Sequence, residues 1–180
     1  MKSEKKLSHL NKQGEAKMVN INKKIISHRE AVAVCEVKVS EEIIKLILEN
    51  NINKGDVVQL SKIAGIMGAK RTHELIPLCH NIPLSEINID IEILNDSSKL
   101  SIKATVKAEW KTGVEMEALT AVSVAALSVY DMCKSVDKHI EINSLKLIKK
   151  SGGKKATSLL YCFLQEIKRI NLSKRLVMKK

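Results

Sequence analysis

The sequence predicts an α+β domain in which helices pack on an antiparallel β-sheet. Two adjacent segments, 87–93 and 100–110, alternate apolar and polar residues across a short run of Asn, Asp and Ser, which is typical of a β-hairpin. Three other segments carry apolar residues at helical spacing or over most of their length, the longest from 113 to 136. A chain of 180 residues can bury the core of one such domain.

The first expected elements are a strand and a helix. The segment from Glu30 to Val39 is rich in β-branched residues and is predicted to be a strand. Ser40 then precedes two acidic residues. A hydroxyl cap with acids in the first turn favours a helix, because both interact with unpaired backbone N–H groups. The apolar stripe of this helix consists of Ile43, Ile44, Ile47 and Leu48.

A second helix is predicted after the Lys54-Gly55-Asp56 break, and it ends near Lys70. Its apolar positions are Leu60, Ile63, Ala64 and Met67. Pro77 and Pro83 then bracket the segment IPLCHNIP, which cannot be regular helix because proline lacks a backbone N–H and clashes with the preceding turn.

The hairpin follows this loop, and a third helix follows the hairpin. Thr112 and Glu115 have the spacing of a capping box, so they are predicted to open this helix. Segment 113–136 is apolar nearly all round, which indicates a buried core helix. A last strand is expected from about His139 to Lys149.

The resulting order of elements is β-α-α-β-β-α-β. With one helix treated as an insertion, this order is the split βαβ of a ferredoxin-like α+β domain with an antiparallel sheet and an extra helix. We expect residues 1–28 to be a largely irregular lead-in and residues 29–154 to form the single domain. Residues 155–180 are expected to be a basic tail, some of whose apolar positions also fit a helix.

The net charge of +11 is concentrated at the two ends of the chain. Residues 1–30 carry +5 and residues 151–180 carry +7, whereas residues 31–150 carry −1. A folded nucleic-acid module places its basic patch on the domain itself, so this distribution favours solvated tails over a nucleic-acid partner. The alternative is a nucleic-acid-binding protein that uses its basic termini, with steeply salt-dependent binding.

The four cysteines are scattered, at positions 35, 79, 133 and 162, without a C-x-x-C pair. This pattern favours reduced thiols in a cytoplasmic protein over a disulfide framework or a zinc ribbon. No run reaches the roughly 18 uninterrupted apolar residues of a membrane span. The Lys-rich N-terminus has no apolar segment behind it, so no secretory signal is expected.

Polar residues within apolar segments are the candidates for chemistry. Asp131 and Lys134 are three apart on the third helix and share a face, so they form either an ordinary surface ion pair or a lysine held near a carboxylate for proton transfer or phosphate binding. Lys54 precedes a helix N-terminus, which is either a simple turn or an anion site. Lys70 and Glu117 fit the helix dipole as end residues, which gives each of them a structural explanation.

Cys79 and His80 stand together in the Pro-bracketed loop. Zinc binding by these two residues with Cys133 lacks a fourth ligand and matches no known spacing, so we expect no metal. A Cys-His nucleophile pair is a weak alternative, because adjacent residues rarely point at one another. A loop histidine that contacts substrate is the favoured functional interpretation, and a merely exposed histidine is the structural one. Residues 151–154, SGGK, lack the spacing of a phosphate-binding P-loop.

Three segments together resemble one protein family. They are KGDVVQLSKIAGIMGAKRTHELIPLCHNIPL (54–84), KTGVEMEALTAVSVAALSVYDMCKSVDK (111–138) and KSGGK (150–154), and weaker similarity extends through HLNKQGEAKMVNI (9–21) and HREA (28–31). These segments resemble cyclic pyranopterin monophosphate synthases, the MoaC family. Matches over several long segments are far more specific than a short motif.

The resemblance implies a fold, a reaction and an assembly. The fold is ferredoxin-like, and the reaction is the lyase step of molybdenum cofactor biosynthesis that converts 3′,8-cyclo-7,8-dihydro-GTP to the pterin product cyclic pyranopterin monophosphate with release of diphosphate. The assembly is a homo-oligomer, a hexamer formed as a trimer of dimers, with the active site between subunits. No further cofactor is implied.

The resemblance also assigns site residues. It places the catalytic groups at Asp131, Lys134 and Lys54. Substrate contacts are expected from Leu78, Cys79, His80, Met116, Glu117, Arg29 and Lys70. Arg29, Lys70 and His80 would bind phosphate, and Glu117 would hold the ring edge. For a lysine to act as a base, we expect the pKa of Lys54 or Lys134 to be depressed.

Two positions depart from the family pattern. Asn81 follows the histidine where the family usually has Pro, and Asn20 replaces a usual Asp. Because of Asn81, a member that retains the assembly without activity is a third alternative. The residues that argue against it are the intact Lys54, His80, Asp131 and Lys134.

Overall fold

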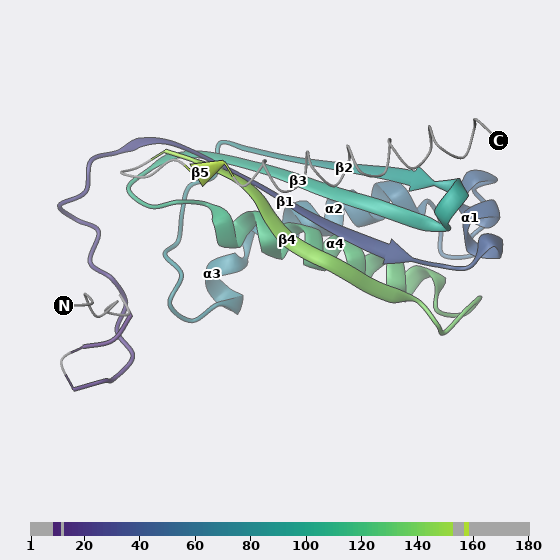
Figure 1. Ribbon diagram of the computed structural model, residues 1–180, viewed down its shortest axis with the longest axis horizontal. Helices are drawn as coiled ribbons and strands as arrows, with labels where there is room; N and C mark the ends of the chain where they lie inside the picture. Colours follow the sequence, from purple (N-terminus) through teal and green to yellow (C-terminus); the bar gives the residue numbers. More distant parts are fainter. Residues whose placement is uncertain (1–8, 12, 153–156, 159–180) are drawn as a thin grey trace, which may run out of the picture.

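The computed structural model describes residues 9–11, 13–152 and 157–158 (Figure 1). The expected basic tail, apart from its two residues 157–158, lies outside the described residues. The strands are β1 (Ser27–Lys38), β2 (Glu86–Leu94), β3 (Lys99–Trp110), β4 (Glu141–Ser151) and β5 (Thr157–Ser158). The helices are α1 (Glu41–Leu48), α2 (Val57–Lys70), α3 (Thr72–Leu75) and α4 (Glu115–Cys133), with a 3₁₀ turn η1 at Asn95–Ser97.

The strands form one sheet in the order β2-β3-β1-β4-β5, and every neighbouring pair is antiparallel. Because β2 and β3 form a hairpin and β3 pairs antiparallel with β1, strands β1 and β2 run in the same direction with β3 between them. This arrangement is the split βαβ that the order of elements predicts. The predicted α+β fold class is confirmed.

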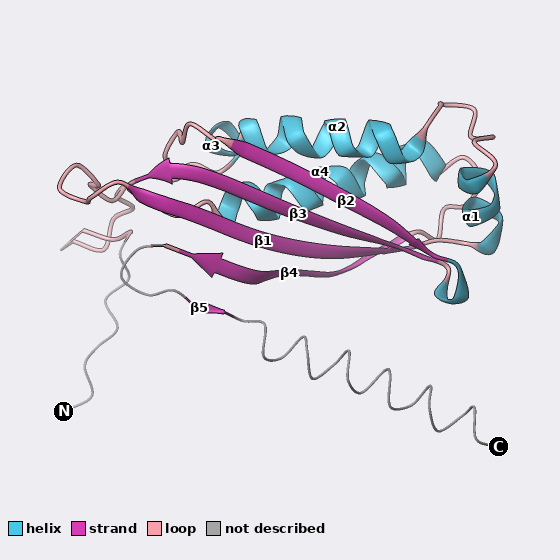
Figure 2. Cartoon of the chain, turned by 90° about the horizontal axis from the view of Figure 1, so that it is seen from above, coloured by secondary structure: helices cyan, strands magenta, loops and turns pink. Residues whose placement is uncertain are grey.

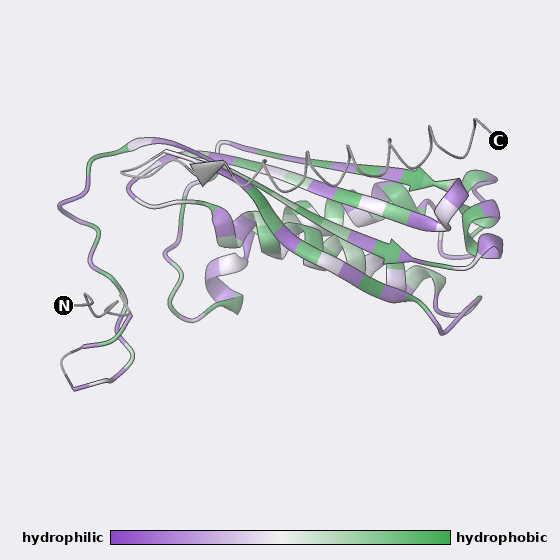
Figure 3. Ribbon diagram, in the orientation of Figure 1, coloured by the Kyte–Doolittle hydropathy of each residue, from purple (hydrophilic) through white to green (hydrophobic). Residues whose placement is uncertain are grey.

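The sheet has one covered face. Helices α2 and α4 lie together on one side of it, and the other side carries no helix among the described residues (Figure 2). Hydropathy alternates along the strands, as the one-sided cover requires (Figure 3). The open face is charged, with ion pairs such as Lys99–Glu36 at 3.0 Å and Lys149–Glu30 at 2.6 Å. The covered face, α4 and the buried residues of α1 and α2 form the core.

The predicted starts of the first two helices are confirmed. Ser40 Oγ accepts a hydrogen bond from the N–H of Ile43, and Asp56 Oδ1 accepts one from the N–H of Gln59. Segment 54–56 therefore forms a turn, in which Gly55 has a φ of 99°, and its last residue, Asp56, caps α2. The sequence did not predict the short helix α3, which follows α2 directly.

The predicted capping box at Thr112 and Glu115 is wrong. Val114 is the N-cap of α4 and makes no side-chain capping bond, so Glu115 is the first helical residue rather than the third. The Glu115 carboxylate folds over Gly113, where a Cβ would collide with it, and accepts a hydrogen bond from Lys150 of β4 at 3.2 Å. The ion pair with the neighbouring strand replaces the local capping bond.

Helix α4 is the central core helix. By length and composition it could cross a membrane, but it packs on β1, β3 and β4 and against α2, and ten of its residues are buried. Packing against α2 is close because α2 carries glycine at the contact. A Cβ on Gly65 would approach the carbonyl oxygen of Ala121 to 2.8 Å. This contact fixes α2 beside α4 and so determines which of their ends meet.

Candidate functional site

Asp131 joins two lysines that are far apart in the sequence. Its Oδ2 accepts a hydrogen bond from Lys54 Nζ at 2.9 Å, and its Oδ1 lies 2.7 Å from Lys134 Nζ. Lys54 Nζ also donates to the backbone carbonyl of Asp131 at 2.7 Å. The N-terminal end of α2 thus meets the C-terminal end of α4. The three predicted catalytic residues form one cluster, here called the lysine-aspartate cluster.

The charges of this cluster stabilise one another. The pKa of Asp131 is lowered to about 2 by hydrogen bonds from Lys134 and Lys54 and by their positive charges. In turn, the hydrogen bond and charge of Asp131 raise the pKa of Lys134. In the isolated chain, Lys134 is therefore not the lysine whose pKa is depressed. All three side chains remain about half exposed, so the cluster is open to a ligand.

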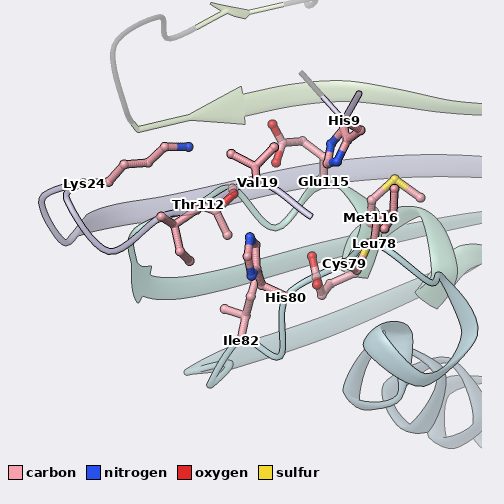
Figure 4. Close-up of a pocket in the computed structure, with 13 residues that line it drawn as sticks. His9, Val19, Lys24, Leu78, Cys79, His80, Ile82, Thr112, Glu115 and Met116 are labelled. Carbon is pink, nitrogen blue, oxygen red and sulfur yellow. The ribbon is translucent and has the colours of Figure 1, made fainter. Parts of the chain in front are cut away.

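A cavity of about 340 Å³ lies at the other end of α4 (Figure 4). Five predicted substrate contacts line it, namely Leu78, Cys79, His80, Met116 and Glu117. The Pro-bracketed loop supplies the first three, and the first turn of α4 supplies the other two. The cavity is also lined by His9, Val19, Ile21, Lys24, Ile82, Thr112, Gly113 and Glu115. Its size is within the range of small-molecule sites.

Glu117 is the unusual residue of this cavity. This side chain is buried at the N-terminal end of α4, and only 4% of the residue is exposed. Burial raises its pKa to about 7, and the neighbouring Glu115 adds to the increase. A carboxyl group with this pKa is partly protonated near neutral pH, so it can both donate and accept a hydrogen bond. The sequence suggested that Glu117 simply interacts with the helix dipole, but that role does not explain why the side chain is buried.

A second cavity, of about 390 Å³, adjoins the first and shares Val19, Ile21 and His80 with it. The remaining wall consists of Met18, Asn20, Asn22, Asn81 and Trp110. Both departures from the family pattern, Asn20 and Asn81, therefore line one cavity, although 61 positions separate them in the sequence.

Arg29 and Lys70 lie at the same end of the domain as the first cavity but do not line it. Arg29 is buried on β1, with 9% of the residue exposed, and its Nε donates to the carbonyl of Trp110 at 3.1 Å. Lys70 is the exposed last residue of α2. The structure thus holds Arg29 in place by its Nε and leaves Lys70 in solvent.

The lysine-aspartate cluster and the first cavity are well separated within one chain. Glu117 and Asp131 are 14 positions apart on the same helix, which corresponds to about 21 Å along its axis. Cys133 is the last residue of α4 and lies 16 positions, or about 24 Å along the helix axis, from Glu117 in the cavity. Cys79, His80 and Cys133 therefore cannot share a metal ion within one chain.

Sequence reasoning missed several residues that line the first cavity. His9 and Lys24 come from the lead-in segment, and Thr112 and Glu115 come from the start of α4. His9 lies in a segment of weaker family similarity, which gave it no role. No local pattern marks Lys24, because an exposed lysine in a Lys-rich segment is unremarkable.

The fold and the two groups of residues define a ferredoxin-like α+β protein with a cavity of small-molecule size and a separate lysine-aspartate cluster. Residues 18–153 match the MoaC family. The chain belongs to the MoaC family. This match confirms the family resemblance of its sequence segments.

Relatives in this family are similar over most of the chain. The cyclic pyranopterin monophosphate synthase of Thermoanaerobacter pseudethanolicus is 47% identical over 148 residues, which are 82% of this chain and 94% of the relative. The synthase of Peptoclostridium acidaminophilum is 50% identical over 147 residues, 82% of this chain and 92% of the relative. Molybdenum cofactor biosynthesis protein 1 of Drosophila melanogaster is 52% identical over 149 residues, and the chain covers 26% of its length.

Proposed function

We propose that this chain is a cyclic pyranopterin monophosphate synthase, a lyase of molybdenum cofactor biosynthesis. Its substrate would be 3′,8-cyclo-7,8-dihydro-GTP, and its products cyclic pyranopterin monophosphate and diphosphate. One observation carries the proposal: Asp131 bridges Lys54 and Lys134, the three residues that the family resemblance assigns to catalysis. The names of the relatives support the same activity.

The two groups of residues suit different parts of this reaction. The paired lysines are positioned to move protons during ring opening and reclosure and to offset the charge that develops on the departing diphosphate. Asp131 remains ionised and keeps both ammonium groups in place. In the cavity, Glu117 and His80 offer hydrogen bonds to the ring system, and the residues of the loop fix its orientation. Asp131 raises the pKa of Lys134 and so favours the charged form of this lysine, which suits it to donate a proton.

The distance between the two groups supports a site shared between subunits. Catalytic groups must lie within a few ångströms of the reacting atoms, and about 21 Å separates the two groups in one chain. Between them the helix layer exposes apolar side chains, namely Leu60, Ile63 and Met67 of α2 and Leu127 of α4. We infer that another copy covers this surface with its helices antiparallel, so that each lysine-aspartate cluster meets the partner's cavity.

The remaining features of the proposal follow from the sequence and from its resemblance to the MoaC family. The homo-oligomer would be a hexamer, a trimer of dimers, in the cytoplasm. Residues 29–154 would form the catalytic domain, with residues 1–28 as a lead-in and residues 155–180 as a tail. Arg29 and Lys70 would bind phosphate once the partner subunit completes the site.

The activity is tested with purified protein and enzymatically prepared substrate. Diphosphate and the fluorescent oxidised pterin are measured for the wild-type chain and for Lys134→Ala. Turnover by the wild type alone supports the proposal. Equal signals from both proteins would contradict it.

The shared site is tested by mixing two inactive variants. Lys134→Ala retains an intact cavity, and His80→Ala retains an intact lysine-aspartate cluster. After unfolding and refolding together in equal amounts, about one quarter of the sites should combine the two intact halves and regain activity. A mixture that remains as inactive as its separate components would show that each chain holds its own site.

A further inference from the structure

The segment before β1 contains a closed, hydrogen-bonded turn at residues 9–17, of which residue 12 is not described. The N–H of Lys17 donates to the carbonyl of His9 at 2.8 Å, and Leu10 and Ala16 form an antiparallel bridge. Gly14 has a φ of 82°, a conformation that glycine adopts without strain. His9 stands at the base of this turn.

The side chain of Asn11 stabilises this turn by three hydrogen bonds. Its Oδ1 accepts hydrogen bonds from the N–H groups of Gln13 and Glu15, both at 2.9 Å. Its Nδ2 donates to Glu15 Oε2 at 2.7 Å. Side-chain bonds of this type add to the backbone bonds of the turn, such as that from the N–H of Asn11 to the carbonyl of Glu15 at 2.9 Å. The turn is thus closed by polar groups, and nothing in it contributes to the core, since Leu10 is 45% exposed.

This turn places His9 on the wall of the first cavity. His9 lines the cavity together with Val19, Ile21 and Lys24 of the same segment, whereas His80 comes from the Pro-bracketed loop. Figure 4 shows the imidazoles of His9 and His80 entering the cavity from these two different segments. Lys111 Nζ donates to the carbonyl of Asn22 at 3.1 Å and so ties the segment to the body of the domain.

The geometry of the turn has no evident role in folding. The sheet and the helices form their core without residues 9–24, because the core cluster begins at Ala31. A closed turn that is exposed, lacks core contacts and presents a ring nitrogen to a cavity is instead suited to hold a ligand contact in place. An imidazole N–H donates well to an anionic oxygen, and such charge-assisted bonds are among the strong ones.

We propose that His9 is a further substrate-contacting residue, which donates a hydrogen bond to an anionic oxygen of the nucleotide-derived substrate. Asn11 is a positioning residue that acts through His9 by closing the turn. The segment 9–24 then forms one wall of the site and is held to the domain at Asn22. This inference rests on the proposed function, which supplies the phosphate-bearing substrate.

Binding is measured in chains that also carry Lys134→Ala, so that the substrate is not consumed. His9→Ala should raise the Kd for the substrate about ten- to one-hundredfold, the usual effect of losing a hydrogen bond to a charged group. His9→Gln, which retains an N–H donor, should recover part of this loss. Lys23→Ala, an exposed change in the same segment outside the cavity lining, should leave the Kd unchanged and serves as the control.

A double-mutant cycle tests the role of Asn11. Asn11→Ala should weaken binding when His9 is present and add little in the His9→Ala background, because the two changes remove the same contact. Equal affinity of His9→Ala and the parent chain would overturn the inference, and so would an undiminished effect of Asn11→Ala without His9. If the parent chain binds no substrate while its circular dichroism shows it folded, the proposed function itself fails, and the inference fails with it.

Discussion

Lys54 Nζ lies 2.9 Å from Asp131 Oδ2, although 77 residues separate the two in the sequence. Lys54 stands just before α2, and Asp131 lies near the end of α4. The two meet because α2 packs closely against α4 in the opposite direction, with Gly65 at the contact. The cluster therefore depends on the packing of the helix layer as well as on its own charges.

A methyl group at Gly65 should disturb this packing. Gly65→Ala adds a Cβ that would collide with the Ile89 side chain and approach the Ala121 carbonyl to 2.8 Å. Alanine is the better helix former, yet overpacking should lower the free energy of unfolding by about 1–3 kcal/mol. The shift of α2 should also lower kcat by moving Lys54. Urea unfolding and turnover assays measure the two effects.

A neighbouring substitution separates packing from helix propensity. Ala64→Gly weakens the helix by about 1 kcal/mol but adds no atom to the contact. It should leave kcat close to that of the wild type. A Gly65→Ala protein more stable than the wild type would contradict the proposed close packing.

Removing the charge of Asp131 should impair catalysis without unfolding the protein. Asp131→Asn leaves two lysines side by side without their carboxylate, and the pKa of Lys134 should fall because its partner raised it. We expect kcat to drop about 10²- to 10⁴-fold and the basic limb of the pH–rate profile to move to lower pH. Asp90→Asn, which breaks the exposed pair with Lys103 on the open sheet face, is the matched control. An unchanged profile for Asp131→Asn would exclude the proposed role.

Glu117 should make stability depend on pH. Its pKa is about 7 in the folded chain against an ordinary value of 4.5, so between these values the folded state holds a proton that the unfolded state has released. The free energy of unfolding should therefore fall as pH rises through this window, by up to about 3 kcal/mol. Glu117→Gln removes this titration.

The comparison of melting temperatures provides the measurement. The Tm of Glu117→Gln relative to the wild type should be higher at pH 8 than at pH 5. Parallel Tm curves for the two proteins between pH 5 and pH 8 would show that Glu117 titrates normally.

Cys79 should be a neutral thiol without a nucleophilic role. Burial raises its pKa, and the charge of Glu117 raises it further. Cys79→Ser should therefore retain turnover within about tenfold of the wild type, whereas loss of a covalent nucleophile costs up to about 10⁶-fold in kcat. Mass spectrometry should show slow alkylation of Cys79 by iodoacetamide at pH 7. Rapid alkylation together with an inactive Cys79→Ser would contradict this prediction and support a nucleophile pair of Cys79 and His80.

The sequence by itself determined the regular elements of the domain. Alternation in 87–93 and 100–110 and the hydroxyl cap at Ser40 depend on residues within a few positions of each other, so they are visible locally. The capping box predicted at Thr112 and Glu115 was wrong, because the Glu115 carboxylate accepts a hydrogen bond from Lys150, 35 positions away, instead of capping the helix.

Only the tertiary structure decided how the site residues are divided. It joined Lys54 to Asp131 and Lys134, buried Glu117, and brought His9 to the wall of a cavity formed by later segments. It also placed the lysine-aspartate cluster and the cavity at opposite ends of α4. Such relationships depend on which helix ends pack together and on how far a residue lies from solvent. These properties arise from contacts between distant segments, and no spacing within the chain encodes them.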